Sequence, residues 1–475
     1  MASLPADDAV AGYAAAEGTF DEGFDATGAP LAHARAAIDA VLRAGPDALA
    51  EKVRATLARN DVAFQSVDGE AEFHVDPVPR VITADDWTLV KRGLAQRVRA
   101  LNAFVADVYG DQAIVADGVV PPYVIHTAPY YEPGMCGIEP PGGGWIGVAG
   151  LDVVRDAEGR WLVLEDNLRT PSGFGYLHAA RLALLEHLEV PPDALPRPLD
   201  GEMDLLSDAL HLAAPASAHG HRAPQAVLLT DGVRNAAFWE HAWLARRLDV
   251  PLAQPSDLEQ HEGRLWFRPP GERRRTLVDV VYRRTDADRL DSPVGELLRE
   301  PIRRGTLGLI NQFGTGVADD KLTYAYVEAM IRYYLGEEPV IPSVPTYDLA
   351  QPGQLAAALD VFDELVVKPR AGHGGVGVLI GPHAGAEHLA RARETVIAEP
   401  GAWIAQRLVM LSTHPTVVEG RLAPRHIDLR PFVFLGEGGH PRVLPGGLTR
   451  VARDAGALVV NSSQNGGAKD TWIMS

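Results

Sequence analysis

Apolar residues recur at helical spacing in two early stretches of the chain. The first covers residues 31–60, and the second begins at Asp85 or Asp86 and runs through TLVKRGLAQRVRALNAFVADVYG. A carboxylate at the start of a helix accepts from its free backbone N–H groups, so we expect Asp85 or Asp86 to cap this helix and Gly110 to end it. Residues 1–30 are small, acidic and rich in glycine, which predicts a loosely held arm.

After Pro121 the apolar runs become short and are broken by glycine and proline. Residues 148–154 and 161–165 have the composition of strands, and the turn RDAEGR between them predicts an antiparallel hairpin. Residues 226–230, 236–248 and 277–284 follow as strand, helix and strand, which is typical of one small α/β unit. Further helices are expected at 177–188, 203–212, 321–335 and 386–397, and further strands at 365–369, 376–381 and 403–409.

Composition narrows the class of protein. The chain has 475 residues, of which 46% are hydrophobic and 23% charged, as in a folded globular protein. It contains no apolar run of the roughly 18 residues needed to span a membrane, and its N-terminus lacks the basic and apolar regions of a signal peptide, so we expect a cytoplasmic protein. The net charge of −19 argues against nucleic acid as the main partner. A single cysteine, Cys136, excludes a disulfide framework and a cysteine-cluster zinc site.

A glycine-rich segment, Gly372-His-Gly374-Gly375-Val-Gly377, lies between two predicted strands. Because no helix follows it, it does not fit a dinucleotide-binding turn. It is either an ordinary hairpin loop or a flap whose backbone N–H groups close over phosphates. Lysines favour the flap, because the chain has few of them: the five are Lys52, Lys91, Lys321, Lys368 and Lys469. Lys368 ends the strand before the segment and Lys321 begins a predicted helix, while a P-loop motif is absent.

Three oxygen-bearing side chains lie on the predicted hairpin. Asp152 and Glu165 can face each other across the strand pair, and Asn167 shares a face with Glu165 because side chains alternate along a strand. Converging carboxylate and amide oxygens suit Mg²⁺. The alternative is that they are solvated polar residues on a sheet face. Asp166 is expected to point to the opposite side and to be structural.

The spacing D-x₁₂-E-x-N resembles the Mg²⁺ signature of ATP-grasp carboxylate–amine ligases, and an Asp-Lys helix start followed by V-V-K-P and a glycine flap resembles their nucleotide half. The order of the two halves is reversed, as in circularly permuted members such as the glutathionylspermidine synthetases. The closest resemblance is to the bacterial circularly permuted ATP-grasp type 2 family. It covers the chain from about residue 85 onward, including VLEDNLRTPSG, GVADDKLTYAYV, VVKPRAGHGGVGV, PRHIDLRPF and LPGGLTRVA.

The resemblance implies an α/β (α+β) circularly permuted ATP-grasp fold with an N-terminal helical region and an inserted small α/β domain. We expect an N-terminal arm and helical region over residues 1–120 and the metal-binding part of the core over 121–220. A small substrate domain is expected over 221–310, and the nucleotide-binding part with its flap over 311–475.

The resemblance also implies site residues. ATP phosphates would be held by Lys321, Lys368 and the flap glycines Gly372, Gly374, Gly375 and Gly377, and Mg²⁺ by Asp152, Glu165 and Asn167. Gln406 would lie at the adenine hinge, where linear relatives usually carry glutamate. Arg430 would balance charge on the transferring phosphate. Arg169 would act there too, and Arg169, Thr170 and Ser172 would contact a substrate carboxylate or acyl phosphate. Arg450, residues 461–464 and Lys469 are further candidates or structural residues.

The preferred hypothesis is an ATP- and Mg²⁺-dependent ligase that converts a small-molecule or peptide carboxylate to an acyl phosphate, which an amine then attacks. An ATP-dependent phosphotransferase that stops at a phosphorylated product would use the same nucleotide site. A nucleotide-binding partner protein without turnover is the third possibility, against which the joint presence of Asp152, Glu165, Asn167, Lys321 and Lys368 argues. Neither nucleic acid nor a membrane is an expected partner.

Overall fold

The computed structural model describes residues 9–10, 12–66, 69–199, 201–219, 223–372, 377–458, 460 and 466–474. Its largest sheet has the strand order β3-β20-β19-β18-β4-β5, with β17 paired to β18. Neighbouring strands are antiparallel except β20 and β3, which are parallel. The strands are β3 (Val75–Ile82), β4 (Val148–Arg155), β5 (Trp161–Asn167), β17 (Thr413–Val418), β18 (Arg421–Phe434), β19 (Arg442–Val451) and β20 (Gly467–Ile473).

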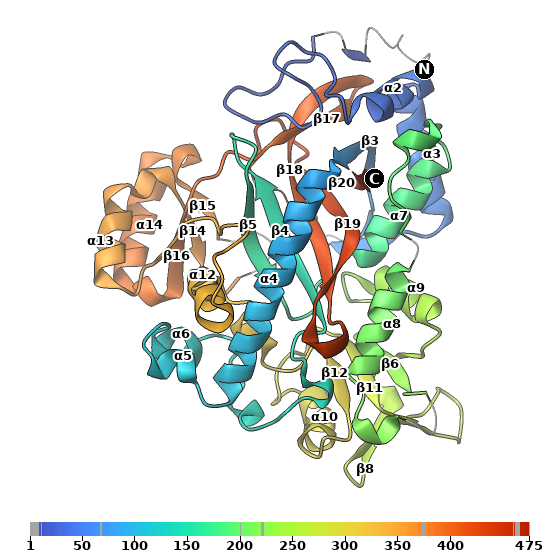
Figure 1. Ribbon diagram of the computed structural model, residues 1–475, viewed down its shortest axis with the longest axis vertical. Helices are drawn as coiled ribbons and strands as arrows, with labels where there is room; N and C mark the ends of the chain where they lie inside the picture. The colour runs from blue at the N-terminus through green and yellow to red at the C-terminus, as the bar shows by residue number, and fades with distance from the viewer. Residues whose placement is uncertain are drawn as a thin grey trace.

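Two groups of helices lie beside this sheet (Figure 1). The long helix α4 (Ala84–Tyr109) crosses in front of the strands, and α2 (Arg35–Ala44), α3 (Pro46–Arg59) and α7 (Phe174–Leu185) lie at the β3–β20 end. The short helices α5 (Ala113–Ala116) and α6 (Pro122–His126) follow α4. No helix in the described part of the chain is long and apolar enough to cross a membrane.

A second, antiparallel sheet lies beside the β5 end of the main sheet and has the order β13-β16-β14-β15. Its strands are β13 (Thr346–Asp348), β14 (Leu365–Pro369), β15 (Leu379–Ile380) and β16 (Trp403–Arg407). Helices α13 (Pro352–Asp360) and α14 (Ala386–Ala398) cover one face and share a small core with it, which includes Phe362, Val367 and Val396. Figure 1 shows this layer projecting to the left of α4.

The third unit is a parallel sheet with the order β12-β11-β6-β7. It contains β6 (Ala226–Thr230), β7 (Leu252–Ala253), β11 (Val280–Arg284) and β12 (Gly308–Ile310), with helices α8 (Glu202–Leu212), α9 (Phe238–Leu248) and α10 (Pro293–Arg303). A small antiparallel sheet of β8 (Leu258–His261), β9 (Arg264–Phe267) and β10 (Thr276–Val278) extends it, and the pair β1 (Ala63–Ser66) and β2 (Gly69–Glu72) stands apart.

The hairpin of β4 and β5 confirms the sequence prediction, and β5 extends two residues further, to Asn167. Other expected elements differ. Residues 31–60 contain two helices rather than one continuous helical stretch, because Gly45 ends α2 and Pro46 begins α3. Residues 277–284 divide between two sheets: up to Val278 they pair with β9, and from Val280 they pair with β6 and β12.

The expected helix over residues 321–335 is also broken. It consists of α11 (Lys321–Tyr324), α12 (Val327–Met330) and a π-helical turn over Ile331–Leu335. Tyr324 donates to the carbonyl of Val163 in β5, and Tyr326 donates to Asp348 in β13. The two tyrosines are thus bound to different sheets, which favours a bend between them. The strand expected over 376–381 is reduced to β15.

The prediction of a loosely held N-terminal arm is wrong for residues 21–24, which are buried. Glu22 accepts from Nε and Nη2 of Arg80 at 2.9 and 2.7 Å and from the hydroxyl of Ser412 at 2.6 Å. Asp21 accepts from Thr413 in β17. Because the guanidinium of Arg80 is fully buried, it requires a countercharge, and the arm supplies it.

Helix α4 ends before Gly110, as expected, but its N-cap is Thr83 rather than an aspartate. The Thr83 hydroxyl accepts from the backbone N–H of Asp86 at 3.2 Å. Asp85 and Asp86 lie instead in the first turn, where their charges complement the helix dipole.

Replacing this cap gives a stability prediction. Thr83→Ala is expected to lower the free energy of unfolding by about 1 kcal/mol, because it leaves a backbone donor of the first turn without its partner. Thr88→Ala is the control, since among the described residues the exposed Thr88 hydroxyl bonds only to the Ala84 carbonyl of the same helix, and its loss should change little. Urea denaturation of both variants measures the difference; equal effects would contradict the capping role.

Candidate active site

The carboxylates of the β4–β5 hairpin lie opposite each other, with Asp152 and Glu165 as register partners. Asn167 is two residues beyond Glu165 and therefore on the same face of β5. Asp166 points to the other face, where it forms a buried ion pair with Arg97, with Nε and Nη2 each 2.7 Å from a carboxylate oxygen. The predicted faces of these residues are thus confirmed.

Asp152 lies within a buried charge network. Arg430 Nε and Nη2 donate to its two oxygens at 2.7 and 2.9 Å, and Arg450 Nη2 lies 2.8 Å from Oδ2. Arg450 also binds Asp428, with Nε 2.8 Å from Oδ1. Burial raises the pKa of Asp152, but the attraction of Arg430 and Arg450 outweighs it and lowers the pKa to about 2. Asp152 therefore stays ionised and orients both arginines.

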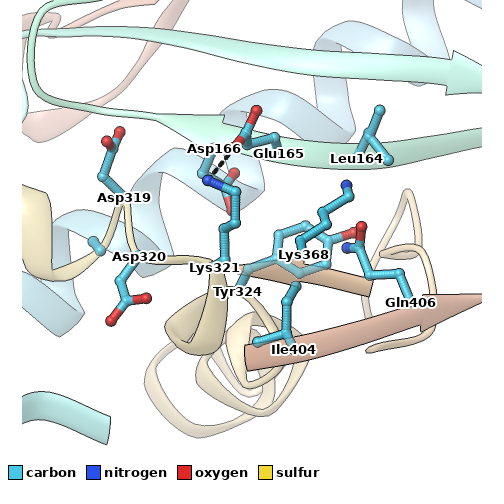
Figure 2. A pocket seen from close by; sticks show the side chains of 11 residues that line it. Leu164, Glu165, Asp166, Asp319, Asp320, Lys321, Tyr324, Lys368, Ile404 and Gln406 are labelled. Atoms are coloured by element: carbon cyan, nitrogen blue, oxygen red, sulfur yellow. Dashed lines mark ion pairs between the residues drawn. The ribbon is translucent and has the colours of Figure 1, made fainter. Parts of the chain in front are cut away.

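The two lysines approach β5 from different elements (Figure 2). Lys321 begins α11, and its Nζ lies 3.3 Å from Glu165 Oε1 and donates to the carbonyl of Gly372 at 2.5 Å. Lys368, near the end of β14, extends toward the same strand. Burial lowers the pKa of the Lys368 ammonium; the charge of Glu165 opposes this shift, and the charge of Lys321 adds to it. An anion bound between them would therefore be attracted to two cations, of which Lys321 is paired with Glu165 and Lys368 has no ion pair among the described residues.

Gln406 lies on β16, opposite Thr346 of β13. Its Nε2 donates to the Thr346 hydroxyl at 3.0 Å. Its Oε1 is buried and has no donor among the described residues. Figure 2 shows this amide beside Lys368, so an unused acceptor faces the space between the sheets.

A cavity of about 700 Å³ joins these groups, a size suited to a nucleotide or another ligand of similar bulk. The predicted site residues in its lining are Asp152, Glu165, Asn167, Arg169, Ser172, Lys321, Lys368, Gly372, Gln406, Arg430 and Arg450. Its described lining carries seven basic and five acidic side chains, a net charge of +2 in a chain whose net charge is −19. The cavity is thus locally attractive to anions.

Other predicted residues lie elsewhere. Thr170 and Gly377 are not part of the described lining, while Gly374, Gly375 and residues 461–464 lie outside the described residues. Lys469 is fully buried; it pairs with Asp76 and donates to the carbonyl of Pro415 at 3.0 Å. Lys469 was expected to be either a site residue or a structural one, and these contacts fit a structural role.

Arg169 marks the end of the cavity beyond Asn167. Its guanidinium lies 3.8 Å from the ring centroid of Tyr130, and its Nε donates to Asp319 at 2.8 Å. Asp288 lies 3.8 Å from Nη1. These contacts fix the plane of the guanidinium, and no hydrogen bond from its two Nη groups is found within the described residues.

A model of the family described as circularly permuted ATP-grasp type 2 matches residues 79–452. The chain belongs to this family. Among its relatives, a protein of Frankia casuarinae named "Putative glutamate--cysteine ligase 2-2" is 46% identical over 467 residues, covering 96% of this chain and 53% of the relative. An uncharacterized protein of Synechocystis sp. is 41% identical, covering 96% of this chain and 97% of the relative. The chain spans about half the length of the Frankia relatives.

Among solved structures, a glutathione synthetase-like effector from Globodera pallida, in its apo form, has a similar fold. The TM-score is 0.59 at 10% sequence identity, over 90% of this chain and 97% of that one. Together with the family match over residues 79–452, this similarity confirms the expected circularly permuted ATP-grasp fold.

Membership of the permuted ATP-grasp family implies ATP and Mg²⁺. The oxygen-bearing side chains of the β4–β5 hairpin can be compared with the ligands that this ion prefers. Glu165 has one ion pair among the described residues, with Lys321, and the buried Nδ2 of Asn167 has no acceptor there, so the Asn167 amide is not committed to another group. Mg²⁺ prefers hard oxygen ligands. A protein usually supplies only one or two of them, and phosphate oxygens and waters fill the other coordination positions. Asp152, by contrast, already binds two arginines. The described residues include no group of three His, Cys, Asp or Glu side chains arranged around a metal position.

Several lining residues were not predicted from the sequence, among them Asp428, Asp319 and Tyr130. Asp428 shares a strand face with Arg430 in HIDLRPF, so the period of two could have drawn attention to it. Asp319 lies two residues before Lys321 in GVADDK, so it is close in sequence to a residue already chosen. Tyr130 lies in an irregular segment far from Arg169 in sequence and carries no such signal.

Proposed function

We propose that this chain is an ATP-dependent ligase that joins a carboxylate to an amine. The observation that carries the proposal is the cavity of about 700 Å³, where basic and acidic groups from several elements meet. Lys321 and Lys368 come from α11 and β14, Glu165 and Asn167 from β5, and Arg430 from β18. Membership of the ATP-grasp family and the name of the Frankia relative support the same activity.

The reaction has two steps. A carboxylate oxygen of the first substrate attacks the γ-phosphorus of ATP, the bond from that phosphorus to the bridging oxygen breaks, and ADP leaves. The amine nitrogen then attacks the acyl carbon, phosphate leaves with the C–O bond electrons, and a proton passes from nitrogen to solvent. Lys321, Lys368 and Arg430 provide positive charge for the phosphoryl oxygens in both steps, which lowers the barrier by electrostatic stabilisation.

Glu165 and Asn167 are the residues proposed to hold Mg²⁺, with Asp152 opposite Glu165 in register. When bound, the ion would neutralise phosphate charge. Arg169, with Thr170 and Ser172 in the following turn, is proposed to receive the carboxylate substrate or its phosphorylated form. We propose a small-molecule or peptide carboxylate and an amine as substrates, and the cytoplasm, where ATP is present, as the location.

The test measures inorganic phosphate released by the chain with ATP and Mg²⁺. The name of the Frankia relative gives the first pair of substrates to add, L-glutamate and L-cysteine, followed by other amino acids in pairs. A ligase requires both the carboxylate and the amine for release. A stable phosphorylated product formed without any amine would establish a phosphotransferase and contradict the proposal. Failure of a non-hydrolysable ATP analogue to bind would contradict both.

Removing the charge of Glu165 is expected to weaken the response to Mg²⁺. In Glu165→Gln, we expect the Mg²⁺ concentration for half-maximal binding of the ATP analogue to rise roughly tenfold or more, because an anionic oxygen ligand becomes a neutral one. Isothermal titration at a series of Mg²⁺ concentrations measures it.

Glu158→Gln is the matched control, since Glu158 lies in the turn of the same hairpin with 66% of its side chain exposed. An unchanged Mg²⁺ dependence in Glu165→Gln would remove Glu165 from the proposed metal site.

A further inference from the structure

A groove distant from the candidate active site lies between α3, α7 and α9. Its volume is about 570 Å³, within the range of small-molecule sites. The lining residues that matter here are Arg59, His178, Leu182, Trp239, Trp243 and Arg246. None of them belongs to the lining of the ATP-grasp cavity, and Figure 1 shows α3, α7 and α9 on the side of the molecule away from the β13–β16 sheet.

The groove is aromatic and held in place. Trp239 and Trp243 lie one turn apart on α9, with ring centroids 6.2 Å apart and planes inclined by 21°. Trp239 Nε1 donates to the carbonyl of Asn60 at 3.2 Å, and the His178 ring lies 4.9 Å from that of Trp243. Leu182 leaves 57% of its surface exposed beside them. A pair of fixed indole rings next to an exposed leucine offers a flat ligand a stacking surface.

The charged side chains of the groove differ in whether they have an ion-pair partner. Nη2 of Arg59 contacts both carboxylate oxygens of Glu186, at 2.8 and 2.9 Å, so that guanidinium is neutralised. His178 pairs with Glu202, Nδ1 to Oε1 2.9 Å. Arg246, in the last turn of α9, has no ion pair with any described residue. In a protein with a net charge of −19, this leaves a local cation at the rim of an aromatic surface.

We infer that this groove binds a planar aromatic anion. The indole rings supply stacking and apolar contact, and Arg246 supplies a hydrogen-bonding cation for a carboxylate, sulfonate or phosphate group. A purely apolar ligand would leave the guanidinium unused, and a cationic one would be repelled by it. The inference does not depend on the proposed ligase activity.

The experiment compares two fluorescent probes of similar shape, 1-anilinonaphthalene-8-sulfonate and its uncharged analogue N-phenyl-1-naphthylamine. Wild-type protein is expected to bind the sulfonate about tenfold more tightly than the neutral probe, as one charge-assisted hydrogen bond predicts. In Arg246→Gln this preference is expected to disappear while the affinity for the neutral probe is retained. Because Arg246 is exposed, the substitution removes a charge without removing a packed side chain.

Arg43→Gln is the matched control, since Arg43 is also an exposed arginine in the last turn of a helix, α2. It should keep the wild-type preference. Several outcomes would overturn the inference: a preference that survives in Arg246→Gln, an equal loss in Arg43→Gln, or probe displacement as the protein self-associates at higher concentration, which sedimentation velocity would detect.

Discussion

Lys368→Met is expected to weaken binding of a non-hydrolysable ATP analogue by about tenfold to a hundredfold. The ammonium of Lys368 lines the cavity beside Glu165 and Lys321, and methionine keeps most of its length while removing its charge. Loss of one hydrogen bond from a charged donor to phosphate accounts for an effect of this size. Isothermal titration with Mg²⁺ present measures the dissociation constant.

The melting temperature distinguishes this loss of analogue binding from misfolding of the variant. Burial lowers the pKa of Lys368, so its charged form is less favourable in the folded chain than in the unfolded one. The substitution should therefore leave the melting temperature unchanged or raise it. Lys91→Met, which removes an exposed lysine of α4, should alter neither quantity. Analogue binding equal to wild type in Lys368→Met would exclude this lysine from the nucleotide site.

Glu240→Gln is expected to lower the free energy of unfolding by about 3–5 kcal/mol, because it leaves a buried guanidinium without its countercharge. Arg284 Nη2 lies 3.0 Å from Glu240 Oε1, and the two side chains are 2% and 0% exposed. Glu240 Oε2 accepts from the backbone N–H of Gly173 at 2.7 Å, and Arg284 donates to the carbonyl of Pro171. The pair thus holds the turn that carries Ser172 to the small α/β unit.

Two control variants accompany Glu240→Gln. Glu300→Gln breaks an exposed pair with Arg304, whose side chains are 44% and 57% exposed, and should cost at most about 1 kcal/mol. The double variant Glu240→Leu/Arg284→Met should recover much of the lost stability, since neither charge of this pair then remains buried. Urea denaturation of all three variants measures the differences. A loss in Glu240→Gln no larger than that in Glu300→Gln would show that the buried pair does not stabilise the turn.

Local patterns in the sequence predicted the elements that local physics determines. The β4–β5 hairpin followed from two apolar runs and a tight turn, and the register of Asp152 with Glu165 followed from the hairpin. The end of α4 at Gly110 followed in the same way. The candidate site was predicted from a spacing within that hairpin and from two lysines among 44 basic residues.

Long-range pairing was decided by the tertiary structure alone. Arg430 is 278 residues from Asp152, and Arg97 is 69 from Asp166; no periodicity links such partners. The break between β10 and β11 has the same origin, because Val278 and Val280 belong to one apolar run but pair with strands of different sheets. The arm around Glu22 is acidic and rich in glycine, yet it is ordered because a buried arginine requires its charge.

The sequence by itself thus determined which residues carry charge and which short elements present them. The tertiary structure decided which opposite charges meet, which of them remain available to a ligand, and that Asp152 is bound to two arginines while Glu165 is bound to one lysine. The physical reason is that the periodicity of a helix or strand acts over a few residues. The desolvation of a charge, by contrast, depends on whatever part of the chain packs against it.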